Sequence, residues 1–367
     1  RRDGTPHKVS DTLELTGAAN VFDCVHVDGG ALRADDGSAL PAVAGIDLDG
    51  GVLESHGTFT RDLGTGAGEL NWSGDGGFSA DDQPLDVNLA GGGTLTWAAD
   101  DGFVADNCAL VFGSSTAQNT LDFQNDLDLG EKVREFRVVD NPHAAADRAV
   151  LSGELTGGED GGIEKTGDGT LELGNGGNSY TGGTRVREGT LLVGSPGALP
   201  ADSSVDVEAD GILDLGGTAF SGSVWNDGTV ENGTIGVTGS LAGSGVYVAA
   251  VSITSGAAVR PGESPGRQTY DSGLTFEDGS QYEWELITNT TDGAGDNYDQ
   301  IVIDGGTLTV SDTAELVLLF PEDTEDGGAE PVDFADPVWE GDHAWTIGDV
   351  GVGGGIADYF QTSMIII

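Results

Sequence analysis

Positive charge is scarce in this chain. Its 367 residues include 14 lysines and arginines against 63 aspartates and glutamates, which gives a formal net charge of −49. Such a surface repels phosphate groups, so it argues against nucleic acids and anionic membranes as partners. The acidity is typical of an ordinary soluble exterior, or of a halophilic or calcium-binding protein in which ions screen or neutralise the carboxylates.

Cysteine, proline and long apolar runs are also scarce. Cys24 and Cys108 lack the spacing of a zinc site, and they leave open either a disulfide or two free thiols. Eleven prolines exclude a collagen-like chain. No run reaches the length of a membrane-spanning helix, so we expect no membrane insertion. No signal peptide is visible, and the chain begins at Arg1 without methionine. We therefore expect a processed or excised portion of a longer protein.

Glycine, in contrast, is abundant, with 63 residues. Short β runs recur along the chain between clusters of Gly, Asp, Asn and Ser, and no window predicts an amphipathic helix. The runs at 170–173 and 190–193 start 20 residues apart, and the run at 213–215 follows the second of them at about the same spacing. This periodicity predicts a β-solenoid. Six of its residues are expected to point into one core: Leu171, Leu173, Leu191, Val193, Leu213 and Leu215.

The segment 162–193 reads GIEKTGDGTLELGNGGNSYTGGTRVREGTLLV. It resembles the autotransporter-associated β-strand repeat, also called the passenger-associated repeat. The matching positions are 165–167, 169–171, 178–184, 186 and 189–191. Looser similarity extends over 255–266 and 299–305. The resemblance implies an all-β fold, an elongated right-handed parallel β-helix, exported to the cell surface or the extracellular space.

We expect this β-helix to occupy residues 1–320. Residues 321–367 are predicted to form an acidic, proline-containing loop and the terminal strands of the same solenoid. The isoleucines at 365–367 would be costly to expose, at about 1.5–3 kcal/mol each. We therefore expect the last coil to be incomplete or capped by a partner, for example through homotypic end-to-end assembly.

Motifs for catalysis are not evident. The five histidines are scattered, and each arginine is expected to pair with some of the many acids. The sequence predicts a non-enzymatic extracellular structural protein: a rod-like, adhesin-like solenoid of a cell-surface, matrix or filament assembly. One alternative is a polysaccharide-active lyase or hydrolase on the same scaffold, which would need clustered acids facing a base. A second alternative is a calcium-dependent adhesin.

Calcium is the ligand with the best candidate site. Asp292, Asp296 and Asp299 gather oxygen donors within a glycine-containing stretch, and calcium prefers such donors. Turn-forming aspartates are the alternative interpretation. No catalytic residue and no other cofactor is predicted. The six tryptophans would form either a stripe that binds polysaccharide or part of the core.

Overall fold

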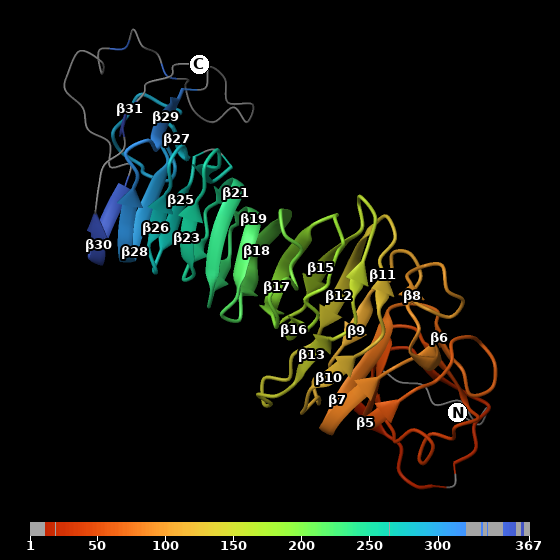
Figure 1. Ribbon diagram of the computed structural model, residues 1–367. Helices are drawn as coiled ribbons and strands as arrows, with labels where there is room; N and C mark the ends of the chain where they lie inside the picture. Colours follow the sequence, from red (N-terminus) through yellow and green to blue (C-terminus); the bar gives the residue numbers. More distant parts are fainter. Residues whose placement is uncertain are drawn as a thin grey trace. The chain divides into compact units, whose positions relative to one another are not determined.

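The structure is a computed structural model that describes residues 12–18, 20–263, 265–320, 332, 336, 348–356 and 361–362. The chain divides into two compact units, Arg1–Pro200 and Ala201–Ile367, and each is described here by itself. Apart from the short 3-10 turn η1 (Ala90–Gly92), the regular elements in the described ranges are β-strands (Figure 1). The expected all-β class is thereby confirmed. Within those ranges, no helix has the length and apolarity needed to cross a membrane.

Parallel strands build the first unit. They are β1 (Thr12–Glu14), β2 (Cys24–Val27), β3 (Gly30–Arg33), β4 (Gly45–Leu48), β5 (Gly51–Phe59), β6 (Leu70–Trp72), β7 (Gly76–Val87), β8 (Leu95–Thr96), β9 (Leu110–Phe112), β10 (Leu121–Phe123), β11 (Leu127–Asp128), β12 (Val133–Val138), β13 (Arg148–Leu151), β14 (Leu155–Thr156), β15 (Gly162–Thr166), β16 (Thr170–Leu173) and β17 (Thr184–Val193).

Each coil of this unit has several faces, and each face pairs with the same face of the next coil. For example, β4 pairs with β2 and β6, while the first half of β5 pairs with β3 and β7. After a register shift, the second half of β5 pairs with the end of β7. Strands distant in sequence, such as β5, β7, β9 and β12, therefore lie side by side (Figure 1). This stacking is consistent with the predicted β-helix-like solenoid.

Apolar ladders fill the interior because alternate residues of a strand point to the same face. One ladder runs through successive coils with all of its side chains buried: Phe59, Val87, Phe123, Leu151, Leu173 and Val193. Beside it, Leu171 is paired with Leu191, and both are fully buried. The predicted core positions at 171, 173, 191 and 193 are thereby confirmed.

Buried polar residues of segment 162–193, such as Lys165 and Asn178, bind backbone groups. The ammonium of Lys165, which is fully buried, donates to the carbonyls of Thr166, Gly167 and Glu188 at 3.1, 2.6 and 2.9 Å. Burial lowers the pKa of Lys165 to about 7. Gly167 itself has a φ of +74°, and an added Cβ would lie 2.5 Å from the carbonyl oxygen of Val138. Glycine is therefore required at that turn.

Parallel strands also build the second unit. They are β18 (Ser203–Asp214), β19 (Ala219–Asn226), β20 (Thr229–Glu231), β21 (Thr234–Gly243), β22 (Val246–Tyr247), β23 (Ala250–Ile253), β24 (Ala258–Pro261), β25 (Arg267–Tyr270), β26 (Leu274–Phe276), β27 (Gln281–Glu285), β28 (Gln300–Val310), β29 (Glu315–Leu319), β30 (Gly348–Ile356) and β31 (Gln361–Thr362).

Its core follows the same logic with larger side chains. Leu213 pairs with Val230, Val230 with Tyr247 and Tyr247 with Tyr270, whose ring is stacked on that of Tyr247 at 5.0 Å. Leu213 and Leu215 are fully buried within this unit, as expected of core residues.

The end of the chain is described only in part. Strand β30 pairs with β28, and β31 pairs with β29. Of the predicted acidic loop and terminal strands at 321–367, the structure describes Val332, Asp336 and the strands β30 and β31, and the isoleucines at 365–367 lie outside the described residues. The predicted boundary at residue 320 and the predicted end-to-end assembly stay predictions.

Candidate functional site

Parallel pairing in register places side chains of successive coils in columns on the outer surface. Among the described residues of the first unit, two groups of polar side chains from successive coils contain a histidine, and the first is such a column. Strands β2, β4 and β6 present the His26 column, which consists of His26, Asp47 and Asn71. Asp35, which follows β3, lies beside His56 of β5 and Asp81 of β7, and we call these three residues the His56 column.

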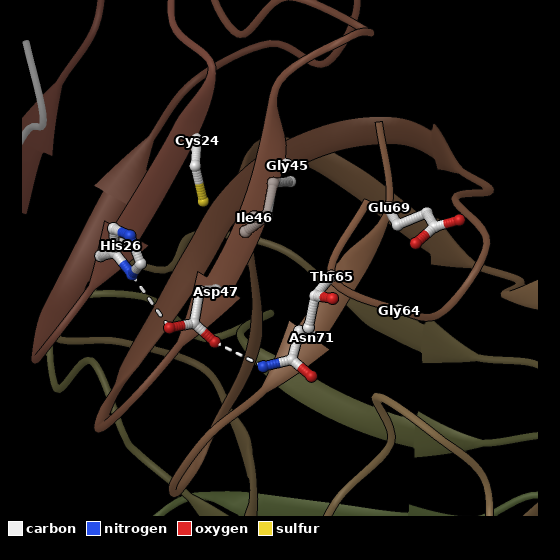
Figure 2. Close-up of a pocket in the computed structure, with 9 residues that line it drawn as sticks. All are labelled: Cys24, His26, Gly45, Ile46, Asp47, Gly64, Thr65, Glu69 and Asn71. Carbon is white, nitrogen blue, oxygen red and sulfur yellow. Dashed lines mark hydrogen bonds and ion pairs between the residues drawn. The ribbon is translucent and has the colours of Figure 1, made fainter. Parts of the chain in front are cut away.

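The His26 column lines a pocket of about 190 Å³ (Figure 2). His26 Nδ1 lies 2.9 Å from Asp47 Oδ2, and the amide of Asn71 donates to Asp47 Oδ1 at 2.7 Å. Burial opposes ionisation of Asp47, but the hydrogen bonds from Asn71 and His26 outweigh it and lower the pKa of this carboxyl. The carboxylate is thus already engaged on both oxygens. The other lining residues are Cys24, Gly45, Ile46, Gly64, Thr65 and Glu69.

Cys24 supplies the pocket's thiol. Burial, followed by the nearby charge of Asp47, raises its pKa, so the thiol stays protonated near neutral pH. A protonated thiol is a weak nucleophile, and the pocket therefore lacks an activated cysteine. Cys24 and Cys108 are both free and half-buried. Of the two alternatives left by the sequence, the structure shows free thiols.

The His56 column consists of Asp35, His56 and Asp81. His56 Nδ1 lies 3.0 Å from Asp81 Oδ2 and 3.5 Å from Asp35 Oδ1. The hydrogen bond to Asp81 raises the pKa of His56, and the neighbouring acids add to the effect. Burial disfavours the charged form of Asp81, yet the hydrogen bonds from His56 and from the backbone of Gln83 lower its pKa. One ring nitrogen thus faces two carboxylates, an arrangement that favours a cation.

A buried carboxylate, that of Glu54, lies two residues before His56 on β5. Glu54 is fully buried, and its two oxygens accept hydrogen bonds from Arg33, Ser79, Ser114 and Thr116. Arg33, Glu54 and Ser79 occupy the same register position on consecutive coils. We call these five residues the Glu54 cluster. Because donors from three coils engage both oxygens, the cluster stabilises the early coils.

The structure gives the three predicted calcium ligands different environments. Asp299 is buried, and its two oxygens accept the backbone N–H groups of Gly266 and Glu285 at 2.8 and 2.9 Å. Burial raises its pKa to about 8 against the opposing effect of these amides. Asp292 and Asp296 are exposed. The calcium site at Asp292, Asp296 and Asp299 stays a prediction.

Within the described residues, the His56 column brings three potential metal ligands together, with one atom of each lying within 4.8 Å of the others. This set was missed in the sequence, where the histidines form no pattern. The signal was available as spacing, since 21 residues separate His26 from Asp47 and also separate Asp35 from His56. The spacings in this column, 21 and then 25, match those that join Arg33, Glu54 and Ser79.

Tryptophans and arginines of the described ranges serve the scaffold. Trp72, Trp97 and Trp284 are buried, so these three belong to the core and not to a polysaccharide-binding stripe. Trp225 is half-buried. Trp339 and Trp345 lie outside the described residues. Arginine–carboxylate pairs confirm the expected role of these arginines: Arg33, Arg61, Arg134, Arg137, Arg148, Arg185, Arg187 and Arg260.

The comparisons with known proteins, rather than the geometry of these columns, indicate an exported, cell-surface protein. Residues 163–193 match the family model described as the passenger-associated-transport-repeat. The resemblance to the autotransporter-associated repeat family is thereby confirmed.

A curated relative, "Adhesin BmaC autotransporter" from Brucella suis biovar 1 (strain 1330), is 33% identical over 183 residues. The match covers 45% of this chain and 5% of the adhesin's length. No solved structure gives a significant match.

Proposed function

We propose that this chain is a non-enzymatic, adhesin-like segment of a surface passenger, and that it works as an elongated, right-handed parallel β-helix rod. The observation that carries the proposal is the in-register parallel stacking within each unit, in a chain that holds a passenger repeat at 163–193. Right-handedness agrees with the general rule that crossovers between parallel strands of one sheet are right-handed.

The mechanical role follows from the direction of the hydrogen bonds. Strand pairs such as β16 with β17 link one coil to the next, so each coil is braced by its neighbours rather than by a large globular core. The acidic exterior keeps such rods soluble and makes them repel one another. A rod of this kind holds a binding surface away from the cell that carries it.

Solution scattering tests the rod. A compact globular chain of this length has a radius of gyration of about 21 Å, and a rod exceeds this value clearly. We expect the larger value together with a β-rich circular dichroism spectrum. A radius near that of a globular chain would overturn the rod.

Adhesion is tested separately with beads coated with the folded chain. We expect the coated beads to be retained on surfaces of matrix proteins or polysaccharides, and beads coated with heat-unfolded chain not to be. The alternative of a polysaccharide-active enzyme predicts instead that soluble polysaccharides are shortened. Such cleavage would overturn the non-enzymatic proposal.

Calcium dependence is a second proposal, and it concerns Asp292, Asp296 and Asp299. The exposure of Asp292 and Asp296 supports it, because an ion from solvent can reach both residues. Calorimetric titration with calcium should show a site that Asp292→Asn and Asp296→Asn weaken together. Equal calcium binding by the double variant and the parent chain would exclude this loop.

A further inference from the structure

We propose that Asp35, His56 and Asp81 form a binding site for a divalent transition metal, with Zn²⁺ as the ion of best fit. The three side chains come from consecutive coils, and their ligand atoms lie within 4.8 Å of one another. Each supplies a donor that zinc accepts, two carboxylate oxygens and one imidazole nitrogen.

The separation between His56 and Asp35 fits zinc coordination, and that between His56 and Asp81 is about 0.3 Å shorter than it requires. Bonds of about 2.0–2.2 Å arranged as a tetrahedron place neighbouring donor atoms about 3.3–3.6 Å apart. His56 Nδ1 lies 3.0 Å from Asp81 Oδ2 and 3.5 Å from Asp35 Oδ1. The first contact is a hydrogen bond, whereas the second is too long for a good one. A proton on Nδ1 thus forms a hydrogen bond with Asp81 alone, whereas a metal ion between the donors would bind both carboxylates.

Neighbouring residues hold the donors in place. The backbone carbonyl of Asp35 accepts the N–H of Leu40 at 3.0 Å, which closes the turn that carries the aspartate. The next residue, Asp36, is paired with Arg61, a buried arginine of the following coil. The backbone that carries Asp35 is therefore fixed, and only its carboxylate has to be ordered when an ion binds.

Asp81 is fixed in a similar way. Its Oδ1 accepts the backbone N–H of Gln83 at 3.2 Å, which leaves Oδ2 directed at His56. The side chain is largely buried, with 11% of its surface exposed, whereas that of Asp35 is 53% exposed. The site is therefore open on one side, and a fourth coordination position remains for water or for a donor from another molecule.

The donor set also selects among ions. Calcium and magnesium prefer sites made of oxygen alone, and an imidazole nitrogen favours zinc and its transition-metal neighbours. Binding moves the proton of His56 Nδ1 to solvent as the metal takes its place, so one proton is released for each ion bound to the protonated site.

Calorimetric titration of the full 367-residue chain with Zn²⁺, in a large excess of Mg²⁺ that occupies weak carboxylate sites, tests the proposal. We expect one site per chain. The variants His56→Gln and Asp81→Asn should weaken it by at least the roughly 10–100-fold that loss of an outer partner alone produces. Asp35→Asn is a third variant that should also weaken binding. Because Asp35 is exposed, this substitution should disturb folding least.

His26→Gln is the matched control, because His26 also contacts a carboxylate at 2.9 Å but has the amide of Asn71 as the third member of its column. It should leave zinc affinity unchanged. Absence of a one-to-one site, or equal binding by folded Asp35→Asn, would overturn the proposal. Replacing Zn²⁺ by Co²⁺ adds a spectroscopic check: a thiolate-to-metal absorption band would assign the ion to Cys24 or Cys108 and also overturn it.

Discussion

The repeat coil at 162–193 and the early coils around β5 and β7 use the same parallel register but fill it differently. In the repeat coil, leucines stack on leucines, as Leu171 does on Leu191, and Lys165 donates to backbone carbonyls. In the early coils, the carboxylate of Glu54 lies at a paired position between Arg33 and Ser79. The scaffold therefore tolerates a buried ionic network as long as every oxygen has a donor.

Clusters of ionisable side chains that could bind a ligand occur in the early coils. Coils with polar columns bring ionisable side chains of several coils to one place, as Asp35, His56 and Asp81 show. Substitutions in the repeat coil and in the early coils test whether a buried ionic network and a leucine ladder contribute differently to stability.

The largest effect is expected in the Glu54 cluster. Glu54→Ala removes the acceptor of Arg33 and of three hydroxyl groups, and breaking a buried pair costs about 3–5 kcal/mol of unfolding free energy. Urea denaturation measures the change. Glu131→Ala, at an exposed glutamate, is the control. Equal stabilities of the two variants would show that the buried network contributes nothing.

Next comes the leucine ladder of the repeat coil. Leu191→Ala leaves a cavity beside Leu171 and should cost about 2–5 kcal/mol. Leu192→Ala, on the half-buried outer face of the same strand, should cost clearly less. Both values come from the same denaturation experiment. If the two substitutions cost the same, the assignment of inner and outer faces in β17 is wrong.

A pH effect is expected at Lys165. Its folded-state pKa is lowered from 10.5 to about 7, so in this range the unfolded chain binds more protons and stability rises with pH. Relative to Lys165→Met, the parent chain should gain at most about 1.4 kcal/mol per pH unit above neutrality. Denaturation at neutral and alkaline pH measures this gain. A constant difference would mean that the three carbonyls keep the ammonium charged throughout.

Salt should change the contribution of the exposed carboxylates to stability but not that of the buried Glu54 cluster. The net charge of −49 predicts that melting temperature rises between low salt and 1 M NaCl, because the exposed carboxylates repel one another less. The cost of Glu54→Ala should stay nearly constant, since its partners exclude solvent. Scanning calorimetry of both proteins at each salt concentration tests this. An unchanged melting temperature in NaCl and in millimolar calcium would exclude both the halophilic and the calcium interpretation.

The sequence by itself determined the strands, their parallel stacking and the core positions of the repeat coil. Alternation of apolar residues is local, and a glycine such as Gly167 marks a turn that no other residue fits, so both can be found without coordinates. Burial of Lys165 was not predicted, because a lysine on a strand is ordinarily solvated. Its position is stabilised by three backbone carbonyls at a turn, which accept hydrogen bonds from its ammonium group.

Only the tertiary structure decided which polar residues meet. The loops between coils differ in length, so Glu54 is 25 residues from Ser79 but 60 from Ser114, and no single period joins all three. The acids were too numerous for any pair to stand out, and His56 had no neighbour in sequence to mark it. Strand register fixes these distances, because backbone hydrogen bonds align each coil with the next whatever the length of the turn between them.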